Sequence, residues 1–192
     1  VVDWSRVIFS DETKIELHPR RRQYVRRPQG ARYSSKYTTK TVKFSPSIMV
    51  WGAIRADGVR TLVKCNGTVD SVEYQRVLTE GLPIVYNTRK LFQQDGATCH
   101  TSRSTNDFFV QKNVRLLENW PPQSPDITIL ENLWDVVKGN VQERQPVNID
   151  EVWQFCVEEW EKIPNDTIKT LYESIPRRVK AVIHARGGNT IY

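Results

Sequence analysis

Cysteine is scarce in this chain of 192 residues, and long apolar runs are missing altogether. The three cysteines, Cys65, Cys99 and Cys156, are odd in number, widely spaced and without a Cys-x-x-Cys pair. This pattern indicates neither a disulfide framework nor a cysteine zinc site, and it favours a reducing intracellular compartment. No stretch approaches the roughly 18 apolar residues of a membrane span, and the first residues do not read as a signal peptide. Because an initiator Met is also lacking, we expect a fragment of a longer protein.

Positive charge exceeds negative charge, with 28 Lys and Arg against 22 Asp and Glu. The balance favours a polyanionic partner such as DNA. Much of the charge falls in residues 20–46, which we expect to form a long loop or a projecting β-ribbon that contacts nucleic acid or a partner subunit. The basic residues of this segment are Arg20, Arg21, Arg22, Arg26, Arg27, Arg32, Lys36, Lys40 and Lys43. A second candidate DNA-facing cluster near the end consists of Arg177, Arg178, Lys180 and Arg186.

Apolar periodicity predicts a mixed α/β domain with helices packed on a sheet. Short apolar runs predict strands at 7–9, 14–17, 47–54, 60–65, 91–94 and 114–117. Helical spacing predicts helices over 70–82, 102–112, 127–141 and 149–163, and a last helix that begins at Pro164. Tryptophans that follow the apolar spacing are expected in the core, namely Trp51, Trp134, Trp153 and Trp160.

Three acids stand in distinct local contexts. Asp11 and Asp95 each follow a predicted strand, so we expect both at strand ends, and Glu131 opens an apolar helical segment. Carboxylates from distant parts of a basic chain suit a site that holds magnesium against phosphate, because magnesium prefers hard oxygen ligands. Spacing alone would equally suit helix caps and turn residues, since a chain with 22 acids contains many such trios.

Several neighbours of these acids have two readings. Glu12 would point to the opposite strand face from Asp11, which favours a solvated or ion-paired role. Asp126 could pass for the third ligand but better suits loop capping or substrate positioning. His100, five residues after Asp95, could contact substrate phosphate or pack against the following helix.

The contexts of the three acids resemble the catalytic domain of the mariner superfamily of DNA transposases, on the branch typified by the nematode Tc elements. The resemblance covers residue 4 to the end of the chain. The matching pieces are Phe9-Ser-Asp-Glu-Thr-Lys14, Ile48-Met-Val-Trp-Gly52, Gln93-Gln-Asp95 with His100, Trp120 with Gln123-Ser-Pro-Asp126, Glu131-Asn-Leu-Trp134 and Ala185-Arg-Gly-Gly188. It implies a ribonuclease H-like fold over residues 1–192, a mixed sheet flanked by helices, and a catalytic triad that matches Asp11, Asp95 and Glu131.

The resemblance also implies an activity and partners. These are metal-dependent hydrolysis of double-stranded DNA at transposon ends, strand transfer of the 3′-hydroxyl into TA target sites, two Mg²⁺ ions per site that Mn²⁺ can replace, and a nuclear location. Residues 20–46 would be a clamp between the subunits of a homodimer, and the N-terminal DNA-binding domain would be absent from this chain. We assign Asp11 as the bridge between the metals, Asp95 to one metal and Glu131 to the other.

Two other readings stay open. One is a transposase-derived DNA-binding or scaffold protein that has lost catalysis. The other is a different ribonuclease H-like nuclease or integrase. The complete acid set favours the enzyme over the first, and the Gln-Ser-Pro-Asp and Glu-Asn-Leu-Trp contexts favour the transposase over the second.

Overall fold

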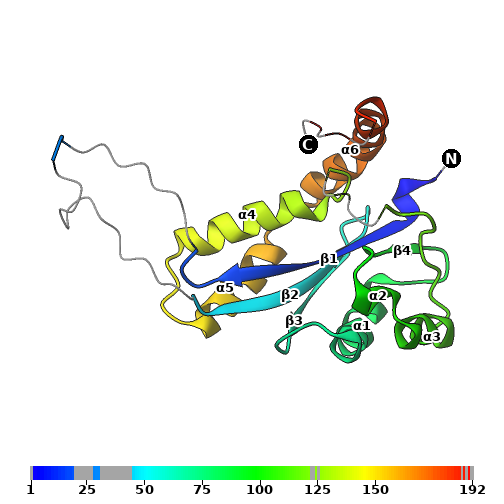
Figure 1. Ribbon diagram of the computed structural model, residues 1–192, viewed down its shortest axis with the longest axis horizontal. Helices are drawn as coiled ribbons and strands as arrows, with labels where there is room; N and C mark the ends of the chain where they lie inside the picture. Colours follow the sequence, from blue (N-terminus) through cyan, green and yellow to red (C-terminus); the bar gives the residue numbers. More distant parts are fainter. Residues whose placement is uncertain are drawn as a thin grey trace.

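A mixed four-stranded sheet forms the centre of the molecule, in the order β3-β2-β1-β4 (Figure 1). The computed structural model describes residues 2–19, 28–30, 45–121, 124, 126–186, 188 and 190. The strands are β1 (Val7–Glu16), β2 (Ser47–Ile54), β3 (Arg60–Cys65) and β4 (Leu91–Gln93). Strand β2 pairs antiparallel with β1 and with β3, whereas β4 runs parallel to β1. Residues 20–27 and 31–44, which hold all the basic residues of the expected clamp, lie outside the described residues.

Strand β1 is longer than the sequence predicts. The expectation of two strands, at 7–9 and 14–17, is wrong, because one ladder to β2 continues unbroken from Phe9 to Glu16. Backbone pairing with β2 carries the strand through its polar residues, whose side chains lie above and below the sheet. Asp11 therefore lies in the middle of β1, opposite Gly52, and not at a strand end. Asp95 does follow the end of β4, as predicted.

The hairpin between β2 and β3 turns at Asp57-Gly58. Gly58 has φ +88°, a backbone conformation that favours glycine, and Arg55 N donates to Val59 O at 2.8 Å to close the turn. Residues 114–117 do not form a full strand, since Phe92 and Leu116 make a single parallel bridge.

Polar side chains cap the first turns of three of the α-helices. Asp70, Ser102 and Asn148 each accept from backbone N–H groups at the starts of α1, α3 and α5. The 3₁₀-helix and α-helices are η1 (Trp4–Arg6), α1 (Ser71–Val85), α2 (Thr98–Thr101), α3 (Arg103–Gln111), α4 (Leu130–Glu143), α5 (Ile149–Glu161) and α6 (Asn165–His184). Helix α1 continues past Pro83, where the sequence predicts its end, because a proline in the last turn lacks only its own N–H donor.

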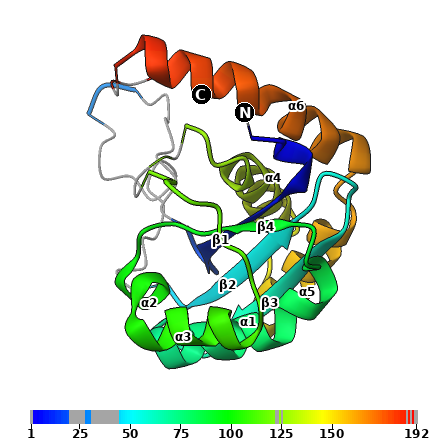
Figure 2. The same cartoon turned by 90° about the vertical axis from the view of Figure 1, so that its right-hand side faces the viewer.

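The sheet separates two apolar cores (Figure 2). On one face Val7, Phe9 and Ile15 of β1 pack with α4, α5 and α6. On the other face Ile8 and Trp51 pack with α1 and α3. Three of the four tryptophans predicted as core residues are fully buried, namely Trp51, Trp134 and Trp160. The predicted mixed α/β class is confirmed, and within the described ranges no helix has the length and apolar character of a membrane span.

Candidate active site

Three different elements carry the three acids. Asp11 comes from the middle of β1, Asp95 follows β4, and Glu131 lies in the first turn of α4. Because β1 and β4 are parallel neighbours, with Phe9 opposite Gln93, the chain brings Asp11 and Asp95 to the same end of this strand pair. Glu131 is close enough to Asp11 for its charge to raise the Asp11 pKa. The sequence prediction that these acids share one region of the fold thus agrees with their positions.

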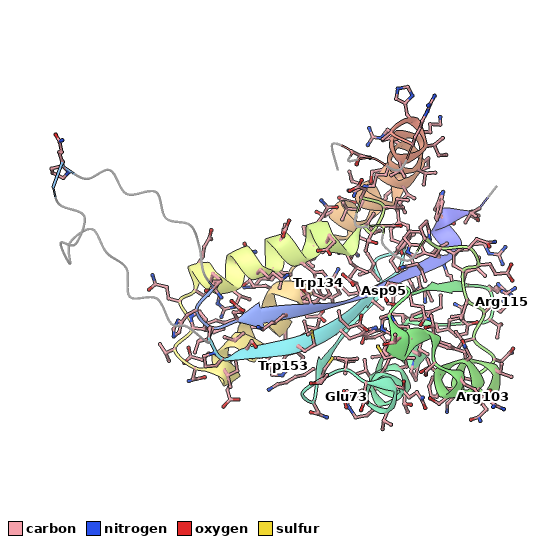
Figure 3. All side chains as sticks on the ribbon, viewed as in Figure 1. Glu73, Asp95, Arg103, Arg115, Trp134 and Trp153 are labelled. Atoms are coloured by element: carbon pink, nitrogen blue, oxygen red, sulfur yellow. The ribbon has the colours of Figure 1, made fainter. Side chains whose placement is uncertain are left out.

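Asp11 lies on the sheet face that α4 covers. The indole Nε1 of Trp134 donates to Asp11 Oδ2 at 3.0 Å, and the Trp134 ring stacks on Trp160 with centroids 4.9 Å apart. Trp134 lies against the sheet at Gly52, the strand partner of Asp11, on the α4 side (Figure 3). A Cβ atom at Gly52 would stand 2.6 Å from Trp134 Cη2. Glycine at position 52 therefore lets the indole lie across the sheet and reach the carboxylate.

The Asp11 carboxyl is unfavourably placed for a negative charge. Burial is the largest cause that raises its pKa, and repulsion from Glu12 and Glu131 adds to it. The Trp134 hydrogen bond works in the opposite direction, but the pKa still rises from 3.8 to about 7. At neutral pH this carboxyl is therefore partly protonated unless a cation compensates its charge.

Asp95 has a different environment. Its Oδ1 atom accepts from Ala97 N at 2.9 Å and contacts His100 Nδ1 at 2.5 Å. The hydrogen bond from His100 is the main cause that lowers the pKa of Asp95, and it outweighs partial burial. The side chain is 48% exposed. Asp95 is therefore ionised at neutral pH and accessible to a ligand.

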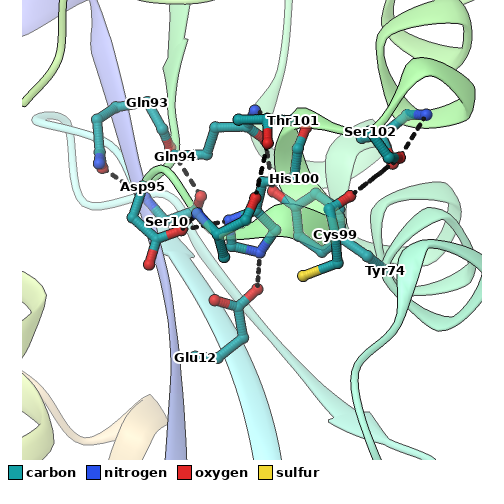
Figure 4. Close-up of polar contacts among 12 residues, drawn as sticks. Ser10, Glu12, Tyr74, Gln93, Gln94, Asp95, Cys99, His100, Thr101 and Ser102 are labelled. Atoms are coloured by element: carbon teal, nitrogen blue, oxygen red, sulfur yellow. Dashed lines mark hydrogen bonds and ion pairs between the residues drawn. The ribbon is translucent and has the colours of Figure 1, made fainter. Parts of the chain in front are cut away.

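His100 is buried between two carboxylates (Figure 4). Its Nδ1 faces Asp95 Oδ1, and its Nε2 lies 3.1 Å from Glu12 Oε1. Burial lowers the His100 pKa, but hydrogen bonds to Asp95 and Glu12 raise it more strongly, to about 10. With this pKa the ring is an imidazolium at neutral pH, so both ring nitrogens donate, Nδ1 to Asp95 and Nε2 to Glu12.

This geometry corrects one prediction and extends another. The prediction that His100 contacts DNA directly is wrong, because its side chain is 3% exposed and both ring nitrogens are hydrogen-bonded to Asp95 and Glu12. The ring packs instead on Tyr74 of α1, with ring centroids 4.0 Å apart. Glu12 lies on the opposite strand face from Asp11, and its predicted ion pair is formed with His100. Sequence reasoning could not name this partner, because 88 residues separate the two.

The second basic cluster divides between surface and interior. Arg178 is 5% exposed and donates to Asn132 Oδ1 at 2.7 Å and to Ser174 Oγ at 2.9 Å. The prediction that Arg178 contacts DNA is therefore wrong. Its buried guanidinium instead hydrogen-bonds within α6 and to the start of α4. The other members of the cluster are exposed and their DNA contact stays a prediction, namely Arg177, Lys180 and Arg186.

Asp126 is held in the loop before α4. Thr190 Oγ1 donates to its Oδ2 at 2.8 Å, and Arg178 donates to its backbone oxygen at 3.3 Å. These contacts agree with the predicted role in fixing the loop. They do not assign Asp126 to the acid trio.

The donor set fits a hard divalent cation. All candidate ligands are carboxylate oxygens, and the raised pKa of Asp11 reports negative charge that is not compensated there. One oxygen each of Asp11 and Asp95 is engaged by the protein, so the other oxygen of each is the candidate ligand atom. Within the described ranges, no three His, Cys, Asp or Glu side chains already form a metal-holding group. Glu131 therefore lies near Asp11, and Asp95 lies at the same end of the β1–β4 pair, without the three forming a closed cage.

Residues 6–153 match the family described as DDE superfamily endonuclease. The chain belongs to this family. Two nematode relatives, the Tcb1 transposase of Caenorhabditis briggsae and the Tc1 transposase of Caenorhabditis elegans, are each 34% identical over 196 residues. Each match covers 99% of this chain and 71% of the relative. The endonuclease domain is thus of the Tc1/mariner transposase type, which confirms the family resemblance.

The fold is also found in the Mos1 transposase. The Mos1 paired-end complex with the left transposon end matches with a TM-score of 0.74 at 22% identity, over 98% of this chain. The endonuclease domain spans 57% of that Mos1 chain. Two similar Mos1 structures are paired-end complexes with Mn and with Mg. The match confirms that the sheet and its helices form the ribonuclease H-like transposase catalytic fold.

Proposed function

We propose that the endonuclease domain cuts DNA at transposon ends and then joins the freed 3′-hydroxyl to target DNA, at TA sites. The activity of the nematode relatives and the fold shared with Mos1 support this proposal. The observation that carries it is Asp11, a partly buried carboxyl near Glu131 whose pKa is raised to about 7. Like-charged carboxyls close together are unfavourable unless a cation joins them, and functional sites often retain such groups.

Each acid has a distinct proposed role. Asp11 would help to hold both of two Mg²⁺ ions, Asp95 would help to hold one of them and Glu131 the other, and Mn²⁺ could replace Mg²⁺. The Mos1 complexes with Mn and with Mg support divalent ions of this kind. When bound, such ions activate water or a 3′-hydroxyl and stabilise the departing oxygen. Trp134 holds one oxygen of Asp11, and His100 with Ala97 N holds one oxygen of Asp95, so the protein fixes the direction of both carboxylates.

The proposed partner is double-stranded DNA, which the net charge of +6 favours. We also propose a homodimer, joined through the basic segment of residues 20–46, and a nuclear location, where the chromosomal substrate lies. A dimer would let two catalytic domains act on the two ends of one element. Sedimentation of the chain, with and without residues 20–46, tests the dimer.

Nicking of supercoiled plasmid in Mn²⁺ or Mg²⁺ tests the proposed chemistry. We expect the wild-type chain to nick DNA and Glu131→Gln to lose the activity. Glu143→Gln is the matched control, because Glu143 is an exposed residue in the last turn of the same helix. Equal nicking by wild type and Glu131→Gln would remove Glu131 from the site. DNA binding without nicking in either metal would favour the non-catalytic DNA-binding protein.

A further inference from the structure

A chain of three side chains with a buried histidine at its centre runs from β1 to the loop after β4. It consists of Glu12 Oε1, the His100 ring and Asp95 Oδ1, with contacts of 3.1 Å and 2.5 Å (Figure 4). The histidine in the middle is the most enclosed member, because its side chain is 3% exposed whereas that of Asp95 is 48% exposed. Glu12, at 16% exposure, is thus connected to the surface of the site through the histidine.

The imidazole cannot turn freely. Its ring lies on Tyr74 with centroids 4.0 Å apart, and Tyr74 is fully buried. Gln94 Nε2 donates to the His100 backbone oxygen at 3.1 Å, and the Tyr74 hydroxyl donates to Gln94 Oε1 at 2.9 Å. Backbone and ring of His100 are therefore both fixed, so its Nδ1–H has one direction, toward Asp95.

We propose that Glu12 is a positioning residue, which acts through His100 to hold Asp95 Oδ1 and so directs the other oxygen of Asp95 to a divalent metal. The inference rests on the proposed function, because it needs Asp95 as a metal ligand. Outer partners of this kind orient metal ligands, and their loss commonly costs about 10–100-fold in metal affinity. Glu12 suits the role because a carboxylate only accepts, and thereby keeps a proton on Nε2.

The same strand offers a control. Glu16 lies on the same face of β1 as Glu12, four residues further along, but pairs with Lys14 at 3.0 Å. Glu16→Ala removes a second glutamate carboxylate from β1, and this carboxylate does not contact His100. A general effect of strand charge on metal binding would appear in both variants, whereas positioning through His100 would appear only in the variant of Glu12.

The experiment is titration of the purified chain with Mn²⁺ alone, followed by calorimetry, with thermal melts of each variant in EDTA. We expect Glu12→Ala to weaken Mn²⁺ binding about 10–100-fold and Glu16→Ala to change it less than about 2-fold. Asp95→Asn is the reference for loss of the ligand. If Glu12→Ala does not fold, Glu12→Gln keeps the volume and is expected to weaken binding in the same direction by a smaller factor.

His100→Asn separates action through the histidine from direct action of the Glu12 charge. The asparagine amide reaches the place of Nδ1 but not that of Nε2, so it can hold Asp95 without Glu12. We expect His100→Asn to bind Mn²⁺ nearly as the wild type does. In that background Glu12→Ala should have no further effect, because a double-mutant cycle shows coupling only when the two residues act as a unit.

Two results would overturn the inference. One is unchanged Mn²⁺ affinity in Glu12→Ala or Glu12→Gln. The other is an equal loss from Glu12→Ala with His100 and with Asn at position 100, which would mean that the Glu12 charge acts directly. Failure of the proposed function is a different result, because then Asp95→Asn itself leaves Mn²⁺ binding unchanged.

Discussion

Asp11 and Asp95 lie on or beside two neighbouring parallel strands, yet the protein treats their charges in opposite ways. Asp11 is partly buried near Glu12 and Glu131, it accepts a hydrogen bond from the neutral Trp134 indole, and its pKa rises to about 7. Asp95 is half exposed and paired with the His100 imidazolium, and its pKa falls. One carboxylate is thus stabilised before a metal arrives, and the other becomes stable as an anion only with the metal.

This difference suggests a division of labour. Asp95, already charged and oriented, would hold a cation without losing a proton, whereas Asp11 would release its proton when positive charge is bound beside it. Metal binding and proton release are coupled in this way at many sites. A second imidazolium beside Asp11 would remove the repulsion but would also oppose the cation. The environment of Asp11 therefore destabilises the metal-free folded chain, and it suits a site that binds a cation.

The largest expected effect is loss of DNA nicking, to the same extent when either aspartate is replaced. Asp11→Asn and Asp95→Asn should each reduce plasmid nicking by at least roughly 10³-fold, because residues that act as one catalytic unit each cost nearly the whole activity. Quantitative nicking assays in Mn²⁺ measure this. Asp135→Asn, an exposed position on α4, is the control. A variant that stays folded and nicks at the wild-type rate would remove its aspartate from the site.

The same two variants should change stability with opposite signs. In EDTA at pH 8, Asp11→Asn relieves repulsion and should raise the free energy of unfolding by about 1–3 kcal/mol. Asp95→Asn removes a charged partner from buried His100 and should lower it by about 1–2 kcal/mol, a value reduced because Asp95 is half exposed. Urea unfolding measures both. Shifts of the same sign would contradict the contrast between the two sites.

The pH dependence sharpens the contrast. Since the Asp11 pKa is about 7 when folded and about 3.8 when unfolded, the folded state retains a proton that the unfolded state releases. Stability without metal should therefore fall as pH rises from about 4 to about 7. Asp11→Asn should abolish this decline, so the two proteins should agree at pH 4 and differ at pH 8. Urea unfolding across this range measures the difference.

Asp95 should behave in the reverse sense, because its pKa is lowered in the folded state. Its contribution to stability is present above the unfolded pKa of 3.8 and is lost as pH falls through the folded pKa. The stability deficit of Asp95→Asn should therefore shrink only in acid. A deficit that stayed constant down to the acid limit would mean that the His100 contact has no charge-dependent part.

The smallest expected effect concerns the donor to Asp11. Trp134→Phe keeps a ring on Trp160 but removes the hydrogen bond to Asp11 Oδ2, so nicking should fall about 5–10-fold, equivalent to about 1 kcal/mol. Trp160→Phe is the matched control, because the buried Trp160 Nε1 has no hydrogen-bond partner within the described residues. We expect its activity to stay within about 2-fold of wild type. Equal losses would indicate that ring packing, not the hydrogen bond, supports Asp11.

The sequence by itself determined the elements and the chemistry of the site. Apolar runs predicted β2 and β3, and helical spacing predicted α5, because these signals act between residues close in the chain. The motifs around Asp11, Asp95 and Glu131 likewise named the family. Each of these features is written in neighbouring residues, so it can be read without the fold.

Only the tertiary structure decided which side chains meet. Pairing with β2 made β1 continuous and placed Asp11 in mid-strand, and packing of α4 on Gly52 made Trp134 its donor. Folding also joined Glu12 to His100 across 88 residues. It buried Arg178 beside an exposed neighbour of the same type. Charge and hydrogen-bond partners of this kind depend on distance in space, and local sequence periodicity carries no information about that distance.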